Sequence, residues 1–140
     1  MKYPRSPRDK VGGVVYFGRM VDKIRLMAAG ELHSDLHANL GKGFDHRCVH
    51  FLRVSYPDLS AAVQGGLSDE AALEWAFQHG RRPDEEDIEV WSEFMRKRGW
   101  NDSGSELLAA RKKESGLEDR SDIQTMFAYI DADEGRPPHS

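Results

Sequence analysis

The chain has 140 residues, of which 39% are hydrophobic and 31% charged, and its formal net charge is −4. This composition excludes a disordered chain, because three Trp, six Phe and four Tyr provide material for a core. The length fits one domain over residues 1–140, and the negative charge argues against a general attraction to nucleic acid or to anionic membranes.

Cysteine content and the N-terminal sequence bear on the compartment. Cys48 is the one cysteine in the sequence, which excludes an intrachain disulfide framework and favours a reducing compartment. The first eight residues lack the apolar stretch of a signal peptide, and the apolar run 14–17 is too short to cross a bilayer. We therefore expect a cytoplasmic protein with no membrane partner.

Charge is unevenly distributed between the two ends. Residues 1–25 carry seven Lys or Arg against two Asp, whereas residues 116–140 carry six Asp or Glu against two Arg. Opposite charges attract, so we expect the basic arm, residues 1–10, and the acidic tail, residues 131–140, to lie together, either within one chain or between two copies.

The first predicted elements are an extended arm and a helix. Pro4 and Pro7 predict that residues 1–10 are extended. Apolar residues then recur at i, i+3, i+4 and i+7 over residues 17–28, which predicts a helix that ends near Gly30. Leucines every four residues over 32–40 predict a short helical turn before Gly41 and Gly43.

Three helices are expected in the middle of the chain. An apolar stripe over residues 44–52 places Cys48 in the core. Pro57 opens the next helix, and Ser68 caps the third, with acidic residues in its first turn.

The C-terminal half is expected to hold three more helices. Pro83 begins one that ends at Gly99, with acidic residues near its start, basic residues near its end and the buried stripe Ile88, Trp91, Phe94 and Met95. A helix over 107–114 follows, and the capping-box pattern of residues 121–124 begins the last. The predicted fold is all-α, a compact single domain of five to seven short helices with an extended basic arm.

Four histidines form two i, i+4 pairs, which can chelate a metal ion on one helix face. They are His33 with His37 and His46 with His50, with Asp35 and Asp45 nearby as further candidate ligands. The alternative is that these histidines are solvated surface residues, since His46 and His50 lie opposite the apolar stripe. Each of these two histidines is two residues from Cys48, which on a helix means about 200° of rotation, so neither imidazole can readily reach the thiol. This opposes a Cys-His nucleophile pair within the helix and leaves only a histidine from elsewhere in the chain as its base.

Two ligand-loop patterns are rejected. The sequence 131–135 resembles the start of a calcium loop, but its glycine comes one position early and the closing Glu is missing. The sequence 41–43 lacks the spacer and the Lys-Ser or Lys-Thr of a phosphate loop, so its glycines are expected to end a helix.

The N-terminal cations form a candidate interaction surface. The residues are Arg5, Arg8, Arg19, Asp22 and Lys23, with Asp131 and Asp133 as expected partners from the acidic tail. Forked hydrogen bonds from the arginines can hold a small anion or phosphate ligand. The alternative is a structural network between the two ends, which would support a dimer if the tail came from a second copy.

Several motifs in order resemble a known bacterial family. They include Tyr3-Pro4-Arg5-Ser6-Pro7-Arg8, Arg19-Met20-Val21-Asp22-Lys23, Gly41-Lys42-Gly43-Phe44-Asp45, Lys97-Arg98-Gly99-Trp100 and Asp131-Ala132-Asp133-Glu134-Gly135. On these motifs the chain resembles the family called domain of unknown function 5069. The resemblance implies a bacterial protein that forms one domain by itself, and it implies no reaction, ligand, cofactor or catalytic residue. The histidine pairs are not part of these motifs, which weakens the metal hypothesis.

The sequence favours binding over catalysis, because the charges of the two ends are unlike and no catalytic set is assembled, and it leaves the cofactor unknown. The leading hypothesis is a self-associating binding or interaction module that uses the N-terminal surface. Two alternatives stay open: a metal-binding protein or enzyme that uses the paired histidines, and a protein that binds a small anion through the arginines.

Overall fold

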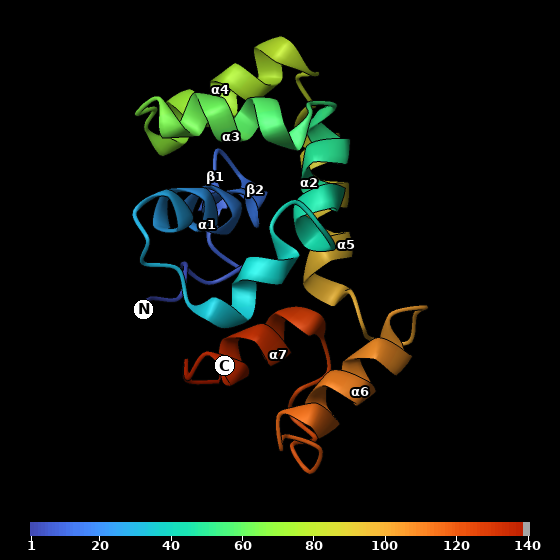
Figure 1. Cartoon of the computed structure of the whole chain (residues 1–140). Coiled ribbons are helices and arrows are strands. Elements are labelled where there is room, and N and C mark those ends of the chain that lie inside the picture. Colours follow the sequence, from blue (N-terminus) through green and yellow to red (C-terminus); the bar gives the residue numbers. More distant parts are fainter. Residues whose placement is uncertain (139–140) are drawn as a thin grey trace. The chain divides into compact units, whose positions relative to one another are not determined.

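The computed structural model describes residues 1–138, which form seven α-helices, one short 3-10 helix and one two-stranded sheet (Figure 1). The expectation of a mostly helical protein is confirmed, and the sheet corrects the prediction of an all-helical one. The chain divides into two compact units, Met1–Trp91 and Ser92–Ser140, which we describe separately. The expectation of one domain over residues 1–140 stays a prediction.

The arm of the first unit leads into a small β-hairpin. β1 (Lys10–Val11) pairs antiparallel with β2 (Val14–Val15). Gly12 and Gly13 have φ values of 55° and 82°, the left-handed conformation that tight two-residue hairpin turns require. The sequence pattern missed this hairpin because strands of two residues are too short to show alternation.

α1 (Phe17–Ala28) contacts α3 (Tyr56–Gln64) and α4 (Asp69–His79), which also contact each other (Figure 1). The apolar positions that predicted α1 are buried: Phe17, Met20, Val21 and Ile24. The helix ends before Gly30, whose φ is 72°, as expected from the sequence.

Two short elements connect α1 to α3. The predicted helical turn after Gly30 is the 3-10 helix η1 (Ser34–Asn39), and α2 (Phe44–Leu52) follows with Cys48 fully buried, as predicted. The Ser55 side chain caps α3, with Pro57 in its first turn, and the predicted cap Ser68 accepts a hydrogen bond from the Ala71 N–H at 3.1 Å.

α5 (Glu85–Lys97) runs from the first unit into the second. It begins two residues after Pro83, because Asp84 acts as the cap. The Asp84 carboxylate accepts from the Asp87 N–H at 2.8 Å, and the Asp87 carboxylate accepts from the Asp84 N–H at 3.1 Å. Phe94 was expected in the buried stripe, but it is 41% exposed. At about 100° per residue it falls at the edge of that stripe.

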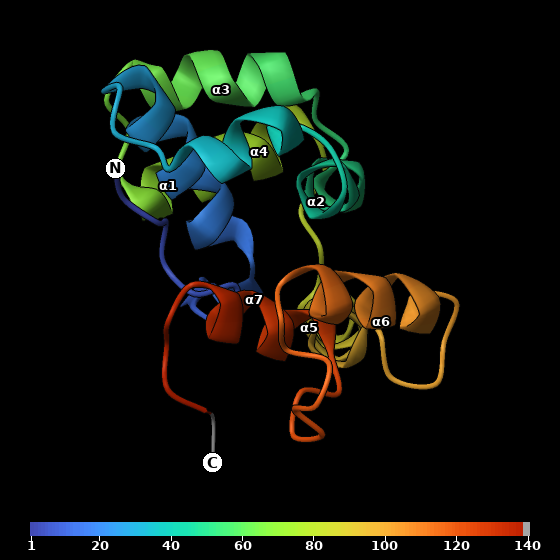
Figure 2. The ribbon, with the colours of Figure 1, turned by 60° about the horizontal axis from the view of Figure 1, so that its bottom comes forward.

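The second unit contains α6 (Ser105–Glu114) and α7 (Met126–Asp133), which contact each other (Figure 2). Its core cluster is Leu108, Ile123 and Tyr129. The predicted capping box at residues 121–124 is wrong. Ser121 and Asp122 lie in a turn, the next two residues have no regular secondary structure, and Thr125 caps α7 by accepting from the Ala128 N–H at 3.2 Å. No helix within residues 1–138 combines the length and the apolar character needed to span a membrane.

Candidate functional site

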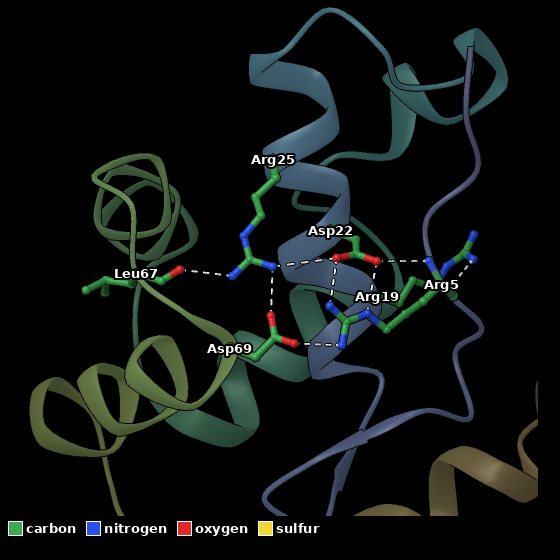
Figure 3. Close-up of polar contacts among 6 residues, drawn as sticks. All are labelled: Arg5, Arg19, Asp22, Arg25, Leu67 and Asp69. Carbon is green, nitrogen blue, oxygen red and sulfur yellow. Dashed lines mark hydrogen bonds and ion pairs between the residues drawn. The ribbon is translucent and has the colours of Figure 1, made fainter.

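The predicted N-terminal surface centres on Arg5, whose guanidinium lies between two carboxylates (Figure 3). Its Nε and Nη2 donate to Asp22 at 2.9 and 2.8 Å, and its Nη1 donates to Asp69 at 2.8 Å. Arg25 donates to Asp69 at 2.7 Å and to the Leu67 carbonyl at 3.0 Å. We call Arg5, Asp22, Arg25 and Asp69 the arginine–aspartate cluster.

This cluster balances its own charges. The hydrogen bond to Asp22 is the main cause that raises the pKa of Arg5. Burial alone would raise the pKa of Asp69, but the hydrogen bonds from Arg5 and Arg25 outweigh it and hold that pKa below its ordinary value. An added anion would have to displace a carboxylate, so the cluster serves to attach the arm to α1 and to the start of α4.

A glycine makes room for this attachment. A Cβ on Gly18 would lie 2.8 Å from Nη1 of Arg5, closer than side-chain atoms normally approach. The small residue in α1 therefore lets the Arg5 side chain lie against the helix backbone.

Arg8, Arg19 and Lys23 are the other basic residues of the predicted surface. The Arg8 backbone N–H donates to the Ser6 hydroxyl at 3.2 Å, and Arg19 Nη1 donates to the Arg5 carbonyl at 3.1 Å. Arg19 and Lys23 are each 3% exposed. Lys23 belongs to a buried ion pair and therefore adds nothing to an exposed surface.

The partner of Lys23 is Asp45, a fully buried carboxylate at the start of α2. Lys23 Nζ lies 3.1 and 3.0 Å from the two Asp45 oxygens. The Tyr16 hydroxyl donates to Oδ1 at 2.7 Å and the Gly41 N–H to Oδ2 at 2.9 Å. We call Asp45 and these three partners the Asp45 cluster. From the sequence, Asp45 was only a candidate metal ligand. No sequence pattern links it to Lys23 or Tyr16, which lie 22 and 29 positions earlier in the chain.

Two buried groups beside Asp45 keep their protons. Burial, and then the charge of Asp45, raise the pKa of the Tyr16 hydroxyl, which therefore donates its hydrogen bond across the neutral pH range. The same two causes raise the pKa of the Cys48 thiol. Cys48 is thus a buried core residue and not an activated nucleophile.

A surface pocket of about 600 Å³ lies at the start of α2. Its lining is Gly41, Lys42, Gly43, His46, Arg47 and His50. We call it the α2 pocket. None of these six residues carries a carboxylate, and two of them, Lys42 and Arg47, are basic. Although the whole chain is negative, this depression therefore has a positive local charge.

The two histidine pairs have different geometries. His46 and His50 lie one turn apart in α2, with ring centroids 6.2 Å apart. His33 caps η1, its Nδ1 accepting from the Asp35 N–H at 3.2 Å, and His37 Nε2 lies 2.8 Å from the Leu32 carbonyl. A 3-10 helix has three residues per turn, so the i, i+4 spacing does not bring His33 and His37 onto the same face of η1.

Metal ligation needs more donors than one pair supplies. Within residues 1–138, no three His, Cys, Asp or Glu side chains are grouped as a metal site requires. Asp45, one of the two carboxylates suggested as further ligands, is occupied by Lys23 and Tyr16.

The acidic residues suggested as partners of the arm belong to the second unit. Asp131 and Asp133 lie in α7, so the predicted tail begins inside a helix, and its residues 139 and 140 lie outside the described part. Arg136 donates to Asp131 at 3.2 Å and to Glu134 at 2.6 Å. The hypothesis that the two ends meet stays a prediction.

Comparison with known proteins gives a family but no activity. No curated protein matches the chain. The model of the family described as "Domain of unknown function (DUF5069)" matches residues 1–136, which is nearly the whole chain. The resemblance seen in the motifs is thereby confirmed: the chain belongs to the family of domain of unknown function 5069.

Proposed function

We propose that this protein is a binding module and that it holds a small anionic ligand of the phosphate class in the α2 pocket. The observation that carries this proposal is the pocket lining, which combines Lys42 and Arg47 with two imidazoles and contains no carboxylate. The positive end of the α2 dipole points toward the same place, because the pocket includes the residue that caps the helix, Gly43.

Size and accessibility fit a small ligand. A volume of about 600 Å³ lies in the range typical of small-molecule sites. Lys42, His46 and His50 are exposed, so their donors can turn toward a ligand without a rearrangement of the core. Within residues 1–138 the Lys42 ammonium makes no ion pair that a ligand would have to break.

The arginine–aspartate cluster supports this choice of site by contrast. Its guanidinium groups already bind carboxylates at 2.7 to 2.9 Å. Anion binding there would exchange one charge-assisted bond for another, whereas an anion in the α2 pocket would gain a new charge-assisted bond from Lys42.

The test is a titration of inorganic phosphate at constant ionic strength, followed by amide chemical shifts in a ¹H–¹⁵N spectrum. We expect a Kd on the order of 1 mM and shifts at Gly41, Gly43 and His46. Lys42→Met removes one charged donor and should weaken binding about tenfold. Lys113→Met, which removes an exposed lysine from α6, is the matched control and should have no effect. Unchanged shifts at about 20 mM phosphate, well above that Kd, would rule the proposal out.

Self-association is a second candidate function, favoured by large apolar side chains exposed in the second unit. Phe94, Trp100 and Leu107 are 41%, 54% and 50% exposed. A homodimer that covers them would remove this surface from water. A native mass spectrum of the untagged protein should then show a dimer, and Trp100→Ser should increase the monomer fraction. A wild-type spectrum that contains only monomer at micromolar concentration would reject this candidate.

A further inference from the structure

The α2 pocket is formed by a loop that a buried carboxylate holds in place. Gly41, Lys42 and Gly43 precede α2, and two of their backbone φ values are left-handed, 75° at Gly41 and 57° at Gly43. Glycine adopts such values without steric cost, so the loop needs another source of order. The Gly41 N–H donates to Asp45 Oδ2 at 2.9 Å and supplies that order.

An aromatic ring holds the same loop from another direction. A Cβ on Gly41 would lie 3.0 Å from the Tyr56 ring, so the backbone of Gly41 already lies close to the ring. The hydrogen bond to Asp45 and the contact with Tyr56 together define where the loop runs. The position of Lys42, the next residue, follows from them.

Asp45 is in turn fixed by two groups from distant parts of the sequence. Lys23, from α1, reaches both carboxylate oxygens at 3.1 and 3.0 Å, and the Tyr16 hydroxyl reaches Oδ1 at 2.7 Å. Tyr16 has a φ of 72°, which is uncommon for a residue with a Cβ. Three of the four hydrogen bonds to Asp45 therefore come from Lys23 and Tyr16, which the fold holds in place, and the fourth comes from Gly41 in the loop that Asp45 fixes.

Lys23 also has an electrostatic effect on the pocket. Asp45 follows Lys42 by three positions and precedes His46 directly, so an unpaired carboxylate there would repel an anion and attract the pocket cations. The ammonium of Lys23 is buried with it, at 4% side-chain exposure against 0% for Asp45. The pair is neutral, so the charge of Asp45 does not cancel the positive charge of Lys42 in the α2 pocket.

We infer that Asp45 is a positioning residue of the α2 pocket, which fixes the Gly41–Gly43 loop, and that Lys23 and Tyr16 make it able to do so without repelling the anion. This inference rests on the proposed function for its effect on binding. Its effect on the loop is independent of any ligand, so the two can fail separately.

Tyr16→Phe is the mildest test because it removes one hydroxyl and keeps the ring. We expect a folded protein in which the Gly41 amide exchanges with solvent at least about tenfold faster and phosphate binds several-fold more weakly. Tyr129→Phe removes a tyrosine hydroxyl that contacts Ser115 in the second unit, and as the matched control it should change neither quantity.

Asp45 is tested by one substitution, and Lys23 by one that removes its charge and one that keeps it. Asp45→Asn should expose the Gly41 amide to exchange, and Lys23→Met should weaken phosphate binding, whereas Lys23→Arg should restore most of the affinity because it keeps the charge. A fall in stability alone would speed the exchange of amides throughout the first unit, whereas the positioning role predicts that the increase in exchange rate is largest at Gly41.

The outcomes separate the two proposals. If wild-type protein binds phosphate and Tyr16→Phe and Asp45→Asn bind it equally well with an unchanged Gly41 exchange rate, the positioning role is wrong and the proposed function stands. If wild-type protein does not bind phosphate, the proposed function fails. In that case faster Gly41 exchange in both variants still supports the positioning role of Asp45, and unchanged exchange overturns it.

Discussion

Asp69 shows how two guanidinium groups hold one partly buried carboxylate in its ionised form. The side chain is 23% exposed and accepts from Arg5 and Arg25 at 2.8 and 2.7 Å. These bonds outweigh burial and lower the pKa of Asp69 from its ordinary value of 3.8. A carboxylate with a lowered pKa in the folded state stabilises the protein above the unfolded-state pKa, and this contribution is lost as the pH falls through the folded-state pKa.

Asp69→Asn should therefore destabilise the protein most at neutral pH. We expect the difference in free energy of unfolding between wild type and this variant to be largest at pH 6 and to shrink as the pH falls toward 3. Urea denaturation at both pH values measures it. Glu89→Gln, which alters an exposed carboxylate of α5, should give a small difference at either pH. A difference for Asp69→Asn that did not change with pH would contradict the role of its charge.

At the scale of elements, local signals predicted helices well where they were strong. The Ser68 cap of α4 and the apolar periodicity of α1 are both local, and both predictions are confirmed. The β1–β2 hairpin was missed because its strands are too short to give a pattern. The start of α7 was misplaced because residues 121–124 satisfy a capping motif, while Thr125 provides the cap that the fold uses.

The candidate site was predictable only in its parts. In the sequence, His46 and His50 were candidate metal ligands, and residues 41–43 were considered and rejected as a phosphate loop. Their position in one pocket follows from α2 and the loop before it. The Lys23–Asp45 pair could not be foreseen, since an ion pair between residues 22 positions apart depends on where the fold places the two helices and not on sequence spacing.

The corrected start of α7 gives a direct prediction. Thr125→Ala removes the side-chain oxygen that accepts from the Ala128 N–H and should cost about 1 kcal/mol of stability. Ser121→Ala alters the predicted cap, whose side chain is exposed, and should change stability by less than about 0.5 kcal/mol. Thermal unfolding of both variants decides between the two helix starts. If Ser121→Ala cost more stability than Thr125→Ala, the capping box at residues 121–124 would be the correct start of the helix.

At the scale of the whole molecule, the two units differ in the cores they build. The second unit spans about 50 residues, and the buried hydrophobic side chains in its described part are Met95, Leu108, Ile123, Phe127 and Tyr129. The first unit is larger and buries many more apolar side chains, Phe17, Met20, Leu52 and Leu59 among them at 0% exposure. Small units bury a smaller fraction of their surface and are correspondingly less stable.

We therefore expect the second unit to open without the first. Native-state hydrogen exchange should show amides of α6 and α7 exchanging through an opening of lower free energy than amides of α1 and α3. Leu108→Ala removes buried carbon atoms from the smaller core and should cost about 2 to 4 kcal/mol there. If the units open separately, this variant speeds exchange in α6 and α7 and leaves α1 and α3 protected. If protection falls by the same free energy in all four helices, the chain unfolds as one cooperative domain, as its sequence led us to expect.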